Sequence, residues 1–142
     1  MESPVIRFRR WFHKQVVTPV IGERDALPGA LAAAWPELAT VRWRRGGLPP
    51  RIGGWCLGQG TVQGITLWGT VFLAPGVAWD PQLLLHEHRH VEQFARSMLF
   101  PVFYLWESLT RGYSRNRFEA DADAWAATRF ERPRPTILPP GA

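Results

Sequence analysis

Cysteine is almost absent from this chain, and it has no long apolar run. Cys56 is the only cysteine among 142 residues. A single cysteine excludes an intramolecular disulfide and a cysteine-rich zinc cluster, and we expect Cys56 to be a small buried apolar residue. No stretch reaches the roughly 18 consecutive apolar residues that a membrane-spanning helix needs. The sequence therefore predicts neither a disulfide scaffold nor a transmembrane segment.

A secretory signal is not recognisable at the start of the chain, and acidic residues are scarce there. Residues 1–22 contain no continuous apolar segment and no small-residue cleavage site, so we expect a cytoplasmic protein. Residues 1–51 carry nine basic and four acidic side chains, whereas residues 52–110 carry two and four. This basic N-terminal part is either a solvated face or a contact for nucleic acid or an anionic membrane.

Apolar residues make up 46% of the chain, which is enough for a packed core. At this length we expect residues 1–142 to form a single domain that ends in a Pro-rich, extended tail, 131–142. The expected class is α+β, with a small, mixed, strongly twisted sheet. Hydrophobic periods and turn residues predict the elements. The expected helices are 4–17, 29–39, 81–99, 101–111 and 117–130, the expected strands are 40–45, 59–66 and 68–74, and residues 46–54 are expected to form a turn.

Two of the predicted helices have clear start signals. Asp80 followed by Pro81 places a capping side chain before proline at the first helical position, and Asn116 is the expected cap of the last helix. We expect helix 81–99 to pack beneath the sheet and helix 117–130 to lie beside it.

Histidine and glutamate gather in one short segment of helix 81–99. Residues 83–94, LLLHEHRHVEQF, contain three of the four histidines of the chain. On a helical wheel at about 100° per residue, the apolar side chains form one arc and the arginines lie opposite. His86 and His90 fall on the edge of the apolar arc, and Glu87 falls inside it.

A carboxylate on the buried side of a helix needs a partner, because an unpaired buried charge is costly. Residues 86–90, HEHRH, match the H-E-x-x-H pattern, in which two imidazoles one turn apart bind one metal ion and the glutamate hydrogen-bonds to its water. The alternative is a helix with surface histidines and a buried Glu87 paired with an arginine. His88 is off the ligand face and is expected to be partly exposed, and His13 is expected to be structural or superficial.

Two histidines leave a zinc ion short of protein ligands, and the last predicted helix offers acids. Residues 116–126, NRFEADADAWA, include Glu119 and Asp123, which are four residues apart and share a face, whereas Asp121 points away. The alternative is that Glu119 belongs to a capping box and that the acids favour the helix dipole. We expect Glu119 to be the third ligand and Asp123 to orient a ligating histidine.

The two motifs together resemble the gluzincin type of zinc metallopeptidase. They are HExxH at 86–90 and ExxxD at 119–123, and the preceding GITLWGTVFL resembles that group's edge strand, which lines the cleft. The longer pattern is similar to short bacterial HExxH-domain proteins, which share a glutamine three residues after the second histidine, here Gln93, and a tyrosine-rich spacer. The resemblance covers roughly residues 59–130, a zincin-like minimal core.

The resemblance implies a role for each matching residue. His86, His90 and Glu119 would bind Zn²⁺, and Glu87 would act as general base and then general acid. Gln93 would lie near the cleft. Tyr104 and Tyr113 are candidates for stabilising an oxyanion, and no motif chooses between them.

Two hypotheses of different classes follow. The first is a zinc-dependent hydrolase, most simply a peptidase, acting on a peptide or protein whose identity the sequence does not give. The second is a non-catalytic, metal-containing binding module whose basic residues 1–51 contact nucleic acid or an anionic membrane. The presence of Glu87 favours the hydrolase, because a purely structural metal site does not need it. The sequence gives no oligomeric state.

Overall fold

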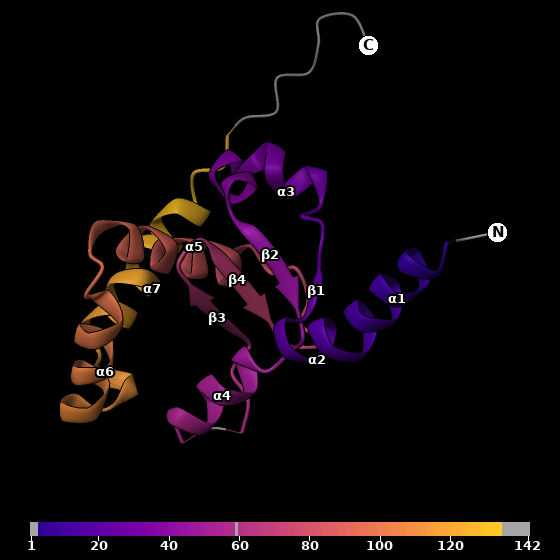
Figure 1. Ribbon diagram of the computed structural model, residues 1–142. Coiled ribbons are helices and arrows are strands. Elements are labelled where there is room, and N and C mark those ends of the chain that lie inside the picture. The colour runs from indigo at the N-terminus through magenta and orange to yellow at the C-terminus, as the bar shows by residue number, and fades with distance from the viewer. Residues whose placement is uncertain (1–2, 59, 135–142) are drawn as a thin grey trace, which may run out of the picture.

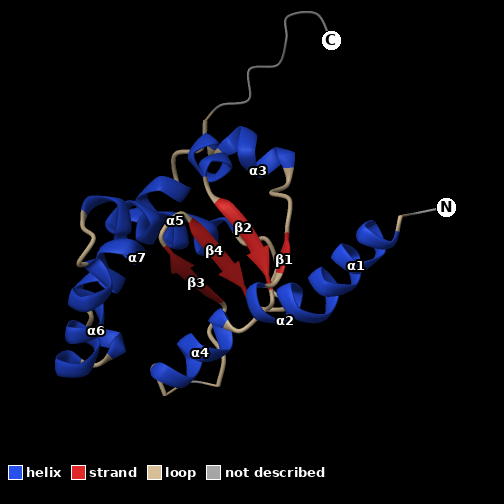
Figure 2. Cartoon of the chain, in the orientation of Figure 1, coloured by secondary structure: helices blue, strands red, loops and turns tan. Residues whose placement is uncertain are grey.

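The computed structural model describes residues 3–58 and 60–134 and shows an α+β fold, as expected (Figures 1 and 2). The strands are β1 (Glu23–Arg24), β2 (Arg42–Arg45), β3 (Gly64–Leu67) and β4 (Thr70–Leu73). The α-helices are α1 (Pro4–Phe12), α2 (Thr18–Ile21), α3 (Gly29–Ala34), α4 (Pro49–Cys56), α5 (Pro81–Arg96), α6 (Phe100–Arg111) and α7 (Arg117–Phe130). A π-helix, His13–Val17, joins α1 to α2, and short 3₁₀ turns cover Pro36–Thr40 and Tyr113–Arg115.

The four strands form one mixed, open sheet in the order β1-β2-β4-β3. β2 and β4 are parallel, whereas β3 and β4 form an antiparallel hairpin in which Leu67 pairs with Thr70. Helix α5 lies against β3 and β4 on one side and α7 on another. The core fills the space between them, and its buried members are Trp35, Leu38, Val41, Trp43, Val71, Leu73, Leu84, Leu85 and Ala126.

Both predicted helix starts at the candidate site are confirmed. The Asp80 carboxylate accepts a hydrogen bond from the Leu83 amide at 2.9 Å, and the Asn116 side chain accepts one from the Phe118 amide at 2.9 Å. Helix α5 ends at Arg96 rather than at residue 99, because Ser97 is extended and its hydroxyl accepts a hydrogen bond from the Leu99 amide.

The prediction of a turn over residues 46–54 was wrong for its second half, where α4 forms. Two prolines begin this helix, at positions where a helix tolerates proline. Gly53 sits inside it because the helix packs closely on β3: an added Cβ would lie 2.7 Å from Cδ1 of Ile65. Cys56, at the end of α4, is exposed, so its predicted burial was also wrong.

The N-terminal helix forms as predicted and extends to Ile21 through the π-helix and α2. Ser3 caps it, with its hydroxyl 3.4 Å from the Ile6 amide. Figure 1 shows α1 projecting from the sheet on the side opposite to α6 and α7. Large apolar side chains of this helix are exposed, including those of Val5, Phe8 and Phe12. Most of the predicted tail, residues 135–142, lies outside the described part of the chain.

Candidate metal centre

Helices α5 and α7 bring His86, His90 and Glu119 together. The Nε2 atoms of the two histidines are 3.1 Å apart, and each lies 3.2 Å from a different oxygen of Glu119. The three side chains are only 15%, 9% and 10% exposed, respectively. One ligand atom from each residue can thus face a common point, and these three residues form a group that can hold a metal ion.

The donor set fits a small divalent cation. Nitrogen and oxygen ligands lie about 2.0–2.2 Å from zinc, so in a tetrahedral site they are about 3.4 Å from one another. The observed separations of 3.1–3.2 Å are close to this value. Three protein ligands also leave one position of a tetrahedral ion for water or substrate.

The charges of the group favour a cation. Burial disfavours protonation of His86, yet its hydrogen bond to Glu119 and the nearby Glu87 and Asp123 carboxylates raise its pKa to about 9. The pKa of His90 is raised despite burial, by Glu119 and Glu87. Burial would raise the pKa of Glu119, but hydrogen bonds from both histidines lower it. The buried carboxylate thus attracts positive charge, which a cation held by neutral imidazoles would supply.

The outer nitrogen of each histidine has its own partner. His86 Nδ1 lies 2.8 Å from Asp123 Oδ1, and His90 Nδ1 lies 2.7 Å from Gln93 Oε1. These contacts aim both Nε2 atoms at Glu119, as partners of metal-ligating histidines commonly do. Gln93, which was expected near the cleft, contacts the candidate site through His90. It is buried behind His90, and its amide donates hydrogen bonds to the Phe118 carbonyl and to Asp121.

Two tyrosine hydroxyls donate hydrogen bonds to Glu119. Tyr104 Oη lies 2.5 Å from Oε1, and Tyr113 Oη lies 3.1 Å from Oε2. Burial and the adjacent Glu119 charge raise the pKa of both phenols, which therefore stay protonated and remain donors. Both sequence candidates for an oxyanion donor thus lie at the centre, each bound to the same carboxylate.

Glu87 is buried beside the group, and its partner is a hydroxyl. Thr66 Oγ1 donates a hydrogen bond of 2.7 Å to Glu87 Oε2. The alternative of a Glu87–arginine pair is absent from the hydrogen bonds and ion pairs of the described residues. Gly64 gives the carboxylate its space, because an added Cβ would lie 2.7 Å from Glu87 Oε1. Gly64 and Thr66 are two residues apart in β3 and therefore lie on the same face of the strand. The contact of that face with Glu87 arises only from the packing of α5 on β3.

His88 lies outside the group, as predicted, but it is buried rather than partly exposed. Its ring stacks on Trp125 of α7 at a centroid distance of 5.5 Å. Neighbouring Arg89 binds Asp121 of α7, at 2.7 Å, and Glu92. This side of α5 therefore anchors α7 and fixes which acids of α7 face the histidines. His13 is exposed on the N-terminal helix, far along the chain from the group.

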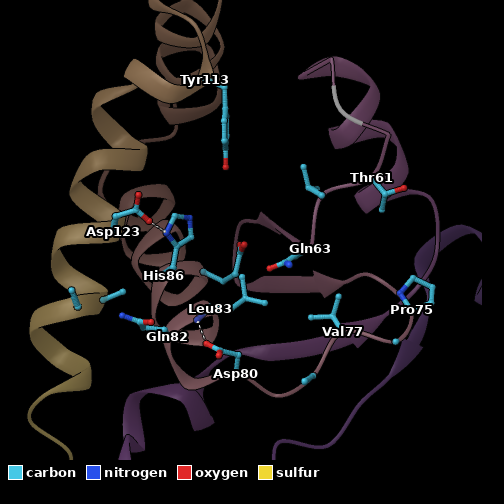
Figure 3. A pocket seen from close by; sticks show the side chains of 17 residues that line it. Thr61, Gln63, Pro75, Val77, Asp80, Gln82, Leu83, His86, Tyr113 and Asp123 are labelled. Atoms are coloured by element: carbon cyan, nitrogen blue, oxygen red, sulfur yellow. Dashed lines mark hydrogen bonds and ion pairs between the residues drawn. The ribbon is translucent and has the colours of Figure 1, made fainter.

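The centre opens to a broad cavity of about 1300 Å³. His86, Glu87, Tyr113 and Asp123 all line it. Figure 3 shows the Tyr113 hydroxyl pointing into this space and His86 bound to Asp123 at its wall. A substrate could therefore reach the candidate ligands and Glu87 from solvent.

The arrangement places three possible metal ligands beside a second buried carboxylate, that of Glu87. These side chains come from α5 and α7, which are separated by about twenty residues of sequence. No family model, curated protein or solved structure matches the chain in comparisons with known proteins.

Proposed function

We propose that this protein is a zinc-dependent hydrolase, most simply a small metallopeptidase of the gluzincin type. His86, His90 and Glu119 would hold the zinc ion, because two imidazoles and one carboxylate are a common ligand set of catalytic zinc. When bound, zinc lowers the pKa of a coordinated water to about 7 and polarises a carbonyl group.

Glu87 is the observation that carries this proposal. A structural metal site needs no further carboxylate, yet Glu87 is 4% exposed, is positioned by Thr66 and lines the cavity beside the ligands. Glu87 would accept a proton as a water oxygen bonds to the peptide carbonyl carbon. It would then give that proton to the nitrogen as the C–N bond breaks.

Tyr113 is the better candidate for stabilising negative charge on the carbonyl oxygen. Its hydrogen bond to Glu119 is the longer of the two, and its side chain lines the cavities on both sides of the centre. Tyr104, held at 2.5 Å from Glu119, would instead position that ligand. In this assignment both tyrosines contact Glu119, but Tyr113 would stabilise the substrate oxygen and Tyr104 would position the ligand.

The test is Glu87→Gln, which keeps the shape of the side chain and removes the proton acceptor. Zinc content should be unchanged, and cleavage of an unbiased peptide pool should fall by about 10²–10⁴-fold or more. Glu92→Gln is the matched control, since Glu92 is on the same helix but binds Arg89 away from the centre. Equal cleavage by the wild-type and Glu87→Gln proteins would remove the support for a hydrolase.

A second candidate function is membrane contact through the N-terminal helix. Helix α1 exposes Val5, Phe8, Trp11 and Phe12 and also carries basic residues, including Arg7 and Arg9. A helix that combines exposed aromatic rings with basic residues suits an anionic bilayer surface better than nucleic acid. Within residues 3–58 and 60–134, no helix has the length and apolar character needed to cross a bilayer. This contact could accompany catalysis or, in a non-catalytic module, be the main activity.

A further inference from the structure

Two cavities with different linings meet at the candidate metal centre. Besides the broad cavity of Figure 3, a second cavity of about 470 Å³ lies between α4 and α6. His86, Glu87 and Tyr113 line both. A molecule bound across the centre would therefore extend into two distinct environments.

The cavity between α4 and α6, called here the apolar chamber, contains no polar side chain apart from those of the centre. Its polar lining residues are the three candidate ligands, Glu87 with its partner Thr66, and the two tyrosines. Its remaining lining residues are apolar, glycine, proline or cysteine, and they include Ile52, Leu57, Ile65, Leu67, Phe94, Phe100 and Leu105. The chamber is thus built for an apolar occupant.

The broad cavity has a mixed wall. Its lining includes the polar side chains of Thr61, Gln63, Asp80, Gln82 and Asp123, and Figure 3 shows Gln63 and Asp80 within it. Polar side chains that can hydrogen-bond to water or to a ligand line this cavity away from the centre, whereas in the chamber such side chains are found only at the centre. A ligand that extends across the centre would therefore meet a mixed wall on one side and an apolar wall on the other.

On this basis, and resting on the proposed hydrolase function, we infer that the substrate is a peptide with bulky apolar residues on one side of the cleaved bond, which fill the apolar chamber, and polar residues tolerated on the other side. The volume of the chamber is within the roughly 300–1000 Å³ of typical ligand pockets. Apolar side chains buried there would leave water, whereas polar ones would lose hydrogen bonds with no replacement.

The neighbouring strand favours a peptide over an acyl chain. β3 is the last strand in the order β1-β2-β4-β3, and all four of its residues line the chamber. Its outer edge pairs with no other strand in the described part of the chain. A peptide can use such an edge through its own amides and carbonyls, whereas an acyl chain has none.

The test measures how tightly zinc-loaded full-length protein binds paired peptide hydroxamates, by isothermal titration calorimetry. One pair extends from the amino side of the metal-binding group and the other from its carboxyl side. Within each pair the two residues nearest that group are leucines or asparagines, which are similar in shape. We expect the leucine peptide of one pair to bind at least tenfold more tightly than its asparagine partner.

Substitutions of residues that line the chamber test whether the leucine preference arises there. Ile52 and Leu105 line it and are about half exposed, at 53% and 52%, so the protein should tolerate Ile52→Asn and Leu105→Asn. Each change should reduce the leucine preference at least threefold. Leu109→Asn is the matched control, because Leu109 lies one turn further along α6, is 75% exposed and is not part of the lining.

The outcomes separate this inference from the proposed function. Equal binding within both pairs by zinc-loaded wild-type protein would overturn the inference and leave the hydrolase standing. A leucine preference that the chamber variants reduce, without any cleavage, would keep the apolar chamber as a peptide-binding site and count against the hydrolase. If the protein holds no zinc, the same dipeptides are titrated as carboxamides at millimolar concentration, and equal binding again overturns the inference. Self-association that Leu105→Asn abolishes, with no leucine preference, would assign the chamber to a second copy instead.

Discussion

His86, His90 and Glu119 each depend on one further side chain for their orientation. Asp123 holds the first, Gln93 the second and Tyr104 the third, at distances of 2.5–2.8 Å. Side chains fixed in this way lose little further freedom when they bind a ligand. The three side chains are therefore already oriented as metal ligands by contacts within the protein.

Metal binding should need His90 but not His88. We expect about one zinc per wild-type chain and none in His90→Ala, measured by elemental analysis of purified protein. Glu119→Gln should also weaken zinc binding severely. His88→Ala should keep the metal and lose roughly 1–3 kcal/mol of stability, because its buried ring packs on Trp125. Full zinc content in His90→Ala would exclude the site, and full content in Glu119→Gln would move the third ligand to Asp123.

The two tyrosines should separate metal affinity from turnover. Tyr104→Phe removes the short hydrogen bond to Glu119 and should weaken zinc affinity about 10–100-fold, as measured by competition with a chelator. Tyr113→Phe should change zinc affinity less and lower kcat more than it changes KM. The opposite pattern would exchange the roles assigned to these residues.

At the scale of elements, two faces of helix α5 make different contacts. One face directs Glu87 toward Thr66 of β3. The other faces α7, where the two histidine ligands meet Glu119 and where His88 and Arg89 also pack. Asp121 binds both Arg89 and Gln93, and these contacts lower the pKa of its carboxyl. Asp121 therefore connects the packing of α7 on α5 with the orientation of the His90 ring.

The close approach of α5 to β3 gives a prediction for Gly64→Ala. The new Cβ would lie 2.7 Å from Glu87 Oε1, so Glu87 must move. We expect zinc to be retained, peptide cleavage to fall at least tenfold, and stability to drop by about 1–3 kcal/mol from overpacking. Gly29→Ala is the control, because a Cβ there meets nothing within 4 Å. Unchanged cleavage by Gly64→Ala would show that the exact position of Glu87 is unimportant.

At the scale of the whole molecule, the cleft and the N-terminal helix lie far apart. Figure 1 places α1 on the opposite side of the sheet from α6 and α7. Helix α1 could therefore contact a surface while the cleft between α4, α6 and α7 stays open. The two proposed activities do not compete for the same part of the protein.

Vesicle binding tests the N-terminal helix. We expect sedimentation with anionic vesicles but little with neutral ones, and weaker binding at high salt because charge attraction is screened. Trp11→Asn should weaken this binding at least tenfold, whereas Trp55→Asn, an equally drastic change at an exposed tryptophan of α4, should not. Tight binding to duplex DNA that Trp11→Asn leaves unchanged would instead favour a nucleic-acid contact.

For the starts and the faces of the two ligand-bearing helices, local chemistry was a sufficient guide. The helical period alone put His86 and His90 one turn apart on one face and Glu87 on the buried side, and the structure has them there. Asp80 and Asn116 marked both helix starts through capping that involves only neighbouring residues. Such features depend on backbone geometry and on side chains within one turn, which a sequence contains in full.

Contacts between elements were decided only by the tertiary structure. The sequence offered three acids in α7, and the packing of Arg89 on Asp121 is what turns Glu119 and Asp123 toward the histidines. Gln93 became a partner of His90, and His88 became buried, because α7 covers that side of α5. Thr66 reached Glu87 from 21 residues away, and Gly53 of α4 allowed a helix to pack closely on β3 where a turn was expected. These outcomes depend on which surfaces meet in space, and local periodicity carries no information about that.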